Sequence, residues 1–249
     1  MPATSAANCG VSSAKCYRSY RVGPPPSLYD LVQEMGRVDR VGDLPPGANR
    51  YEIHLSVPLF VSLFVRVMSV SDKVERNKQL VGIYEVLSAI MVPTGCQHSS
   101  MELYFEHDTN ATDKVPCEKF CSFCTGRVKK HAGEFQRDNL REIMMADLFN
   151  DSPPTFEHVL KFFKTNKTKI YVKGKVPKRL AGQYHGLFLQ LLANGIFELV
   201  VEEKETKNIG TDKLLGKHVV VKLGRRINAN GISGLAIMQD CAWAGISYY

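Results

Sequence analysis

Four of the seven cysteines are spaced as ligands of a metal ion would be. They are Cys96, Cys117, Cys121 and Cys124, which read C-x20-C-x3-C-x2-C. The close trio in CEKFCSFC can place thiolates around one tetrahedral ion, and the distant Cys96 can complete the set. The spacing therefore predicts one zinc ion per chain, with His98 and His107 as alternative ligands. The competing interpretation is a set of thiols that pack as small hydrophobic groups.

A pair of arginines suggests a second kind of chemistry. In the stretch LVQEMGRVDR, Arg37 and Arg40 lie three residues apart behind Gly36. Guanidinium groups arranged in this way are suited to phosphate. The competing interpretation is a structural ion pair with Asp39.

The sequence contains no complete phosphate loop that would accompany these arginines. The nearest match, GTDKLLGKH from Gly210, has one residue too many between its glycines. His218 stands where Ser or Thr would hold magnesium. No Ser/His/Asp arrangement for nucleophilic catalysis is apparent either.

The positive charge is concentrated in one part of the chain. Net charge is +7, and residues 155–226 hold 15 Lys+Arg against 6 Asp+Glu, whereas the remainder holds 17 against 19. Residues 161–179 alone carry eight basic side chains. This region favours a polyanionic partner such as DNA, with largely phosphate contacts and salt-dependent binding. The candidate DNA contacts are Lys169, Lys173, Lys175, Lys178, Arg179, Lys207 and Lys213.

The first 154 residues show alternating signals for helices and strands. Residues 27–36 read as a short helix with Ser27 as N-cap, Asp30 in its first turn and a glycine at its far end. RYEIHLSV alternates apolar and polar residues and predicts a strand. Residues 59–92 have the apolar spacing of two helices. Residues 134–149 also read as a helix, and 150–154 read as a linker.

The basic region has the element order helix, helix, strand, loop, strand. TFEHVLKFFKTN and RLAGQYHGLFLQLLANG each place apolar residues on one helical face, and Asn194-Gly195 ends the second helix. Tyr184 and Phe188 are expected in the core rather than as stacking platforms for bases. The order predicts a winged helix, with the second helix available for DNA and residues 204–217 as the wing. The alternative is a small α+β core with a solvated lysine face.

Several other assignments are excluded or disfavoured. The N-terminal residues have no basic start and no apolar run, so they are no signal peptide. SVPLFVSLFVRVMSV holds an arginine and is too short to span a bilayer, so a buried helix is expected. The composition favours thiols or metal over disulfides, and we expect structural roles for Cys9, Cys16 and Cys241.

Three stretches, in order, resemble the RecQ family of DNA helicases. ATSAANCGVSS (3–13) is similar to the family's fifth helicase motif, and SLYDLVQEMGRVDR (27–40) is similar to its sixth. MELYFEH, which follows Cys96, and then PCEKFCSFC resemble the run before the family's zinc cysteines and the cysteines themselves. The chain departs from the family at Asp39, which replaces a glycine, and at Ser12, which stands where aspartate is usual.

This resemblance implies a function shared between two lobes. In these helicases ATP lies between two RecA-like lobes, and the second lobe contributes arginines that stabilise the transferring phosphoryl group. By resemblance, Arg40 is the candidate arginine finger, and Gln33, Gly36 and Arg37 are nucleotide-side residues. ATP and magnesium would bind only together with an N-terminal helicase lobe. Zinc, DNA junctions, single-stranded DNA, 3′-to-5′ unwinding and a nuclear location are further implications, with no membrane partner.

The expected fold class is α/β and α+β multidomain. The predicted parts are residues 1–58, the end of a RecA-like lobe; 59–130, a helical zinc module; 131–154, a helix and linker; 155–226, a winged helix; and 227–249, a tail without an assigned role. A non-enzymatic DNA-binding module built from the zinc site and winged helix is the alternative function. An unrelated zinc-bearing adaptor is a third and weaker one.

Overall fold

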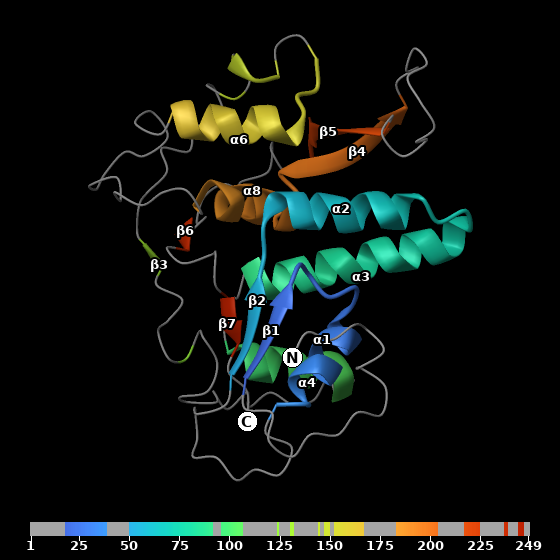
Figure 1. The fold of residues 1–249 in the computed structure, drawn as a ribbon, viewed down its shortest axis with the longest axis vertical. Coiled ribbons are helices and arrows are strands. Elements are labelled where there is room, and N and C mark those ends of the chain that lie inside the picture. The colour runs from blue at the N-terminus through green and yellow to red at the C-terminus, as the bar shows by residue number, and fades with distance from the viewer. Residues whose placement is uncertain are drawn as a thin grey trace.

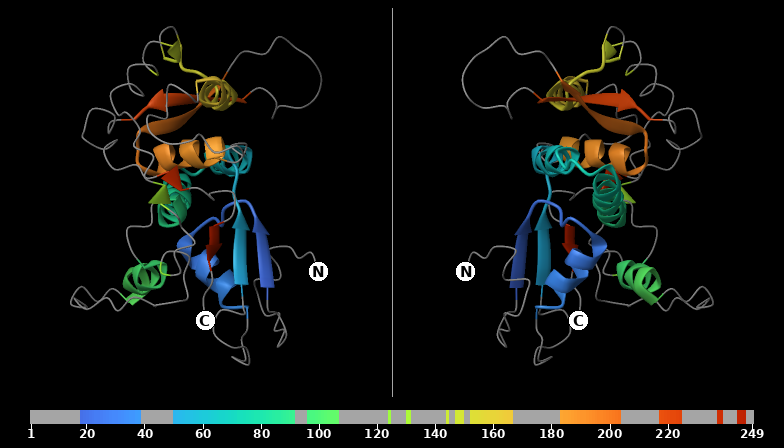
Figure 2. Two further views of the ribbon diagram at one scale, coloured as in Figure 1. Left: turned by 90° about the vertical axis from the view of Figure 1, so that its left-hand side faces the viewer. Right: turned by 90° about the vertical axis from the view of Figure 1, so that its right-hand side faces the viewer.

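The structure is a computed structural model in which the elements stack in layers (Figure 1). It describes residues 18–38, 50–91, 96–106, 124, 130–131, 144, 147–149, 152–166, 183–203, 217–224, 237–238 and 244–246. A small sheet with α1 lies at the bottom of the view, and helices α3 and α2 fill the middle. α8 lies at the height of α2 and packs under α6 and a β-hairpin, with which it forms the upper layer. The side views in Figure 2 show the same order of layers.

The lowest layer is built around a parallel pair of strands. β1 (Arg18–Val22) pairs in parallel with β2 (Arg50–His54), and α1 (Leu28–Met35) lies between them in sequence. Parallel neighbours need a crossover connection, and α1 supplies its helical part. α1 covers the face of the sheet on which Tyr51 and Ile53 are buried. The predicted helix over 27–36 and the predicted strand in RYEIHLSV are confirmed.

Two short strands near the C-terminus return to the earlier part of the chain. β7 (Ala244–Ile246) pairs antiparallel with β2, which gives the sheet order β1-β2-β7. β6 (Ile237–Met238) pairs with β3 (Lys130–His131). The tail, residues 227–249, has no role predicted from its sequence, and its strand β7 contributes backbone pairing to the lowest sheet.

The middle layer is a helical hairpin. α2 (Val57–Met68) and α3 (Lys73–Met91) confirm the prediction of two helices over 59–92. Most of the apolar side chains of α2 are buried, whereas α3 buries only its C-terminal half, from Ile83 onward. α4 (Gln97–Glu106) follows. Among the residues that the structure describes, no helix is both long enough and apolar enough to cross a membrane.

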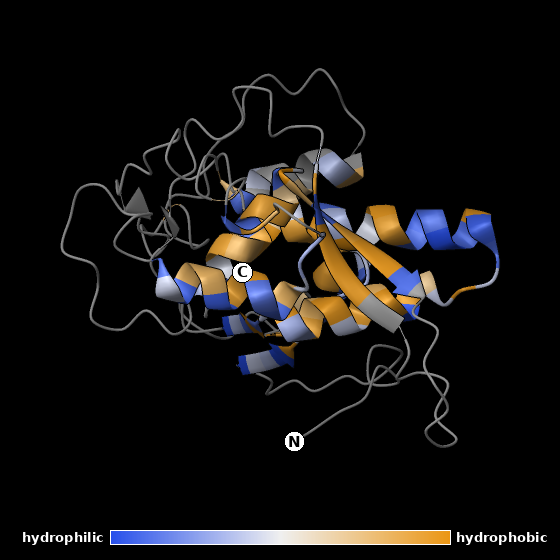
Figure 3. Cartoon of the chain, turned by 90° about the horizontal axis from the view of Figure 1, so that it is seen from above, coloured by the Kyte–Doolittle hydropathy of each residue, from blue (hydrophilic) through white to orange (hydrophobic). Residues whose placement is uncertain are grey.

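The upper layer consists of two helices and a hairpin. α6 (Phe156–Thr165) and α8 (Gln183–Ala193) pack on the antiparallel strands β4 (Phe197–Glu203) and β5 (Lys217–Leu223). The middle of both strands is hydrophobic, and the end at which Glu202 and Glu203 pair with His218 and Lys217 is hydrophilic (Figure 3). At the base of the hairpin a Cβ on Gly224 would lie 2.2 Å from the Gly195 carbonyl oxygen, so only glycine fits there. Gly195 itself has a positive φ of 67°, which explains why α8 ends here.

The apolar core is continuous from the lowest layer to the hairpin. Buried side chains of α1, β2, α2, α3, α8 and β4 belong to one cluster. The described fold is mixed α/β, which agrees with the coarse class expected from the sequence. The finer division into a RecA-like piece, a zinc module and a winged helix stays a prediction, as do the boundaries proposed for them.

Candidate functional site

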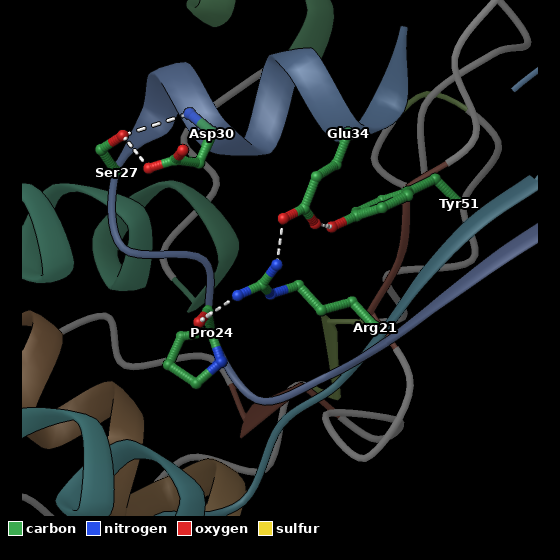
Figure 4. Close-up of polar contacts among 6 residues, drawn as sticks. All are labelled: Arg21, Pro24, Ser27, Asp30, Glu34 and Tyr51. Atoms are coloured by element: carbon green, nitrogen blue, oxygen red, sulfur yellow. Dashed lines mark hydrogen bonds and ion pairs between the residues drawn. The ribbon is translucent and has the colours of Figure 1, made fainter. Parts of the chain in front are cut away.

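The arginine element begins on a well-capped helix. The Ser27 hydroxyl accepts a hydrogen bond from the Asp30 backbone N–H (3.1 Å) and donates one to the Asp30 carboxylate (2.6 Å) (Figure 4). This cap satisfies one of the orphan donors of the first turn. At the other end Gly36 has a right-handed φ of −65°, so its backbone angle does not require glycine. The Arg37 N–H then donates to the Glu34 carbonyl (3.3 Å), which continues the turn beyond the helix.

Glu34 is the centre of a polar cluster that joins three elements. Its carboxylate forms an ion pair with Arg21 of β1 and accepts a hydrogen bond from the Tyr51 hydroxyl of β2 (2.5 Å) (Figure 4). Arg21 also donates to the Pro24 carbonyl (3.3 Å). The side chain of Glu34 is 9% exposed and that of Arg21 is 25% exposed. A carboxylate this buried needs such partners to offset its lost hydration.

The cluster changes the chemistry of the tyrosine. Burial raises the pKa of Tyr51 well above its usual value of 10.0, and the adjacent Glu34 carboxylate raises it further. The Arg21 guanidinium acts in the opposite direction and is the weaker influence. The phenol therefore remains a hydrogen-bond donor over the whole ordinary pH range. It keeps Glu34 bound to β2, and so fixes α1 against both strands.

The candidate nucleotide-side residues differ in how far they are exposed to solvent. Gln33 is exposed and donates to the hydroxyl of Tyr29 (2.7 Å). Gly36 is exposed, and Arg37 is half-buried just after the helix. The structure thus places Gln33 on the solvent side of α1 and Glu34 on the sheet side. Arg40, the candidate arginine finger, and Asp39 lie outside the described residues.

The predicted zinc ligands are described only in part. Cys96 directly precedes α4 and Cys124 lies in a turn, and both thiols are partly exposed. Cys117, Cys121 and His107 lie outside the described residues, as does the side chain of His98. Within the described part of the chain no three His, Cys, Asp or Glu residues are grouped as metal ligands would be. The zinc site stays a prediction.

The second helix of the predicted winged helix is not available for DNA in this arrangement. The expectation of an exposed second helix is wrong for the described residues, because α8 is buried along almost its whole length. Tyr184 and residues 186–192 are buried, and only His185 and Ala193 are half-buried. The helix lies between α2–α3 on one side and α6 with the hairpin on the other (Figure 1). Tyr184 and Phe188 are core residues, as predicted.

The candidate DNA-contacting residues lie outside the part of the chain that the structure describes. They are Lys169, Lys173, Lys175, Lys178, Arg179, Lys207 and Lys213. On α6 the neighbouring Lys161 and Lys164 are exposed. The antiparallel pairing of β4 with β5 does make residues 204–216 the connection between them, as the wing hypothesis requires.

Sequence reasoning missed the polar cluster. Leu28, Leu31 and Met35 form the buried stripe of α1, and Glu34 is part of that stripe. A charged residue on the apolar face of a short helix is a signal of a buried ion pair, and it could have singled out Glu34. Its partners could not be found in this way, because Arg21 and Tyr51 lie 13 and 17 residues away.

The comparisons with known proteins leave this site without a family assignment. No known family matches the chain, and no curated protein is significantly similar to it.

Proposed function

We propose that this chain is the C-terminal part of a RecQ-like, ATP-dependent 3′-to-5′ DNA helicase. One observation carries the proposal. The run Gln-Glu-x-Gly-Arg lies at the end of a helix that crosses between two parallel strands, and its glutamate is bound to both strands. Such an anchor fits an element that must present arginines at a fixed position.

The proposed role of this element is electrostatic. In phosphoryl transfer the protein mainly positions the nucleotide and stabilises the charge on the transferring group. Glu34 would hold α1 rigid, and Arg37 and Arg40 would reach toward the phosphates of a nucleotide held by another lobe. Gln33, on the solvent side of α1, would contact the nucleotide from this lobe.

The proposal also includes a structural zinc ion and a DNA-binding surface. Cys96, Cys117, Cys121 and Cys124 would hold one structural zinc ion that stabilises the region after α4. DNA would dock on the lysine-rich residues 161–179 and on the wing 204–217, since α8 is buried. Because lysine acts as a point charge, most contacts would go to phosphates and would be weakly sequence-specific. Leu214 or Leu215 in the wing would act at the first base pair of a duplex junction, or else pack the loop on the core.

The helicase proposal is tested first at the level of the transcript. Sequencing upstream of codon 1 should show, in frame, a phosphate loop and an Asp-Glu motif. The 249-residue chain itself should hydrolyse no ATP, with or without DNA. In the longer product, Arg40→Ala should lower kcat of the DNA-stimulated ATPase by about 10³-fold or more, with unchanged affinity for DNA. Hydrolysis by the short chain that Arg40→Ala abolishes would contradict the proposed division between lobes.

The DNA surface has its own test. Binding of a fluorescent forked duplex should weaken with salt by about 0.9 log units per log unit of salt for each phosphate neutralised. Reversing the charge of Lys173, Lys175 and Lys178 together should lower both the affinity and this slope. Reversing Lys73 and Lys78, exposed on α3, supplies a control in which the net charge falls by four on another part of the molecule, against six in the triple variant. If the triple variant binds like the wild type, DNA docks on another surface.

The zinc site is tested by metal analysis of the purified chain. One equivalent of zinc is expected, and Cys121→Ser should lose it. Full zinc with unchanged DNA binding in that variant would rule out this ligand set. Zinc and DNA binding without any upstream phosphate loop would favour the alternative function, a non-enzymatic DNA-binding module.

A further inference from the structure

α8 joins the upper layer to the helical hairpin below it. Besides its buried apolar side chains, it is linked to α3 by a hydrogen bond from the Ser88 hydroxyl to the Ala193 carbonyl (3.4 Å). Next to it, Tyr84 of α3 is hydrogen-bonded to the backbone of Leu199 in β4. Burial raises the pKa of Tyr84 to about 12, so this phenol stays neutral at ordinary pH. These contacts place α8 and β4 firmly against α3.

The contact between α8 and α2 is of a different kind. The first turn of α2 receives no side-chain cap from Ser56, and Pro58 has no N–H to satisfy. The Val57 N–H instead donates to Nδ1 of His185 (3.2 Å), which is 128 residues away in the sequence. His185 therefore caps α2 from another layer of the molecule.

This cap works only with a neutral imidazole. A backbone N–H can only donate, so Nδ1 must be unprotonated and the ring proton must reside on Nε2. Protonation would remove the acceptor. It would also place a positive charge at the N-terminus of α2, where the helix dipole is already positive. Both effects oppose the contact between α8 and α2.

From this geometry we propose that His185 is a proton-sensitive latch, which holds α8 and the β4–β5 hairpin on α2 when neutral and weakens that contact when protonated. The latch does not depend on the proposed helicase function. It would couple the position of the upper layer to pH.

The surroundings of His185 also favour its neutral form, as the proposed pH effect requires. Burial lowers its pKa below the ordinary 6.5. The folded state therefore binds the proton less readily than the unfolded state. The stabilisation is complete above pH 6.5 and is lost progressively as the pH falls below that value.

The elements around α8 carry few groups that could titrate in the same range. Among the described residues, β6 carries no titratable group, and the titratable groups on α8, on its other neighbours α2, α3, α6 and β4, and on β2, which leads into α2, are Tyr184, Tyr51, Glu52, His54, Arg50, Arg66, Lys73, Glu75, Arg76, Lys78, Tyr84, Glu85, Glu157, His158, Lys161, Lys164, Glu198 and Glu202. Of these, only His54 and His158 carry an imidazole like that of His185. His158 is exposed on α6 and provides a matched control.

Hydrogen exchange of the full chain at pH 7.5 and pH 5.5 tests the latch. After correction for intrinsic rates, protection of the Val57 amide and of the hairpin should fall at pH 5.5 in the wild type, by at most about tenfold, because this pH lies about one unit below the ordinary pKa of an unfolded imidazole. His185→Asn offers an oxygen where Nδ1 lies but does not titrate, so it should keep the protection at both pH values. His185→Ala should lose protection at both, and His158→Asn should behave like the wild type.

An NMR titration of the wild type covers the case in which these variants fail to fold. The His185 ring should titrate below 6.5 and its protonation should coincide with the change at the Val57 amide. A His185 pKa of 6.5 or above would overturn the proposal. So would a pH step in exchange that persists unchanged in His185→Asn.

Discussion

The two ends of the molecule are held together by different interactions. In the β1–α1–β2 unit a buried carboxylate binds an arginine and a tyrosine from two strands. In the upper layer α6, α8 and the hairpin meet through aromatic and aliphatic side chains, with Phe197 in ring contact with Phe149, Phe163 and Phe188. Apolar contacts can slide into alternative packings, whereas a hydrogen-bonded ion pair accepts only one geometry. The first unit is thus built for exact placement and the second for stability.

The largest effect is expected at the centre of the apolar unit. Phe197 is 1% exposed, so Phe197→Ala should lower the free energy of unfolding by about 3–5 kcal/mol. Phe197→Leu leaves a smaller cavity and should cost about 1.5 kcal/mol. Equilibrium urea unfolding measures both. Equal losses for the two variants would show that cavity size does not control the stability of this layer.

A smaller effect is expected when the polar unit loses its charge. Glu34→Gln leaves Arg21 without its counter-charge and should lower the free energy of unfolding by about 2–3 kcal/mol, because Arg21 remains partly solvated. Glu198→Gln, at an exposed position of β4, is the control and should change stability by less than about 0.5 kcal/mol. An equal loss of unfolding free energy for Glu34→Gln and Glu198→Gln would mean that the Glu34 cluster does not stabilise the lower unit.

The Tyr51 hydroxyl should have the next largest effect. Tyr51→Phe removes one hydrogen bond to Glu34 and should cost about 1–2 kcal/mol at pH 7. Because the folded pKa is raised, the wild type is most stable below pH 10 and loses stability as the unfolded phenol ionises above it. The phenylalanine variant should show a shallower decline above pH 10, with the remainder arising in part from Tyr84. An unchanged decline in alkaline unfolding experiments would exclude Tyr51 as its source.

Local features of these two units could be predicted from the sequence, and long-range partners could not. The helix over 27–36 and its Ser27 cap are encoded within a few residues, and both predictions are confirmed. Five of the six residues from Leu187 to Leu192 are apolar, with Gln190 as the exception, and they spread around most of the helix, which indicates burial on most faces and argues against a recognition helix. The winged-helix prediction rests on one apolar face of this helix, and it is wrong about the exposure of α8 because the other faces are buried too.

The polar contacts between distant residues could not be predicted from the sequence for another reason. The bond between His185 and Val57 joins residues 128 positions apart. The Glu34 cluster requires the register that sets Arg21 beside Ile53 of β2. No periodicity carries such information, because it depends on how the layers stack. The nucleotide-side and zinc residues stay predictions, since Arg40, Cys117 and Cys121 lie outside the described residues.

The smallest expected effect is the loss of a helix cap, which can be measured in both units and compared. Ser27 accepts from Asp30 N–H at 3.1 Å and also donates to the Asp30 carboxylate, whereas Thr155 accepts from His158 N–H at 3.4 Å. Loss of a cap typically costs about 0.5–2 kcal/mol. Ser27→Ala should therefore lower the free energy of unfolding by about 1 kcal/mol, and Thr155→Ala by about 0.5 kcal/mol.

The reason for the difference is that the Ser27 hydroxyl has two partners, and that α1 has only eight residues over which to compensate. Ser27→Thr keeps a hydroxyl cap and should restore most of the loss, and Ser62→Ala, on the exposed side of α2, should leave stability nearly unchanged. Urea unfolding of the four variants in one buffer measures these values. A larger loss for Thr155→Ala than for Ser27→Ala would show that the upper unit, too, depends on a local polar contact, and the contrast between the two units would then be one of degree.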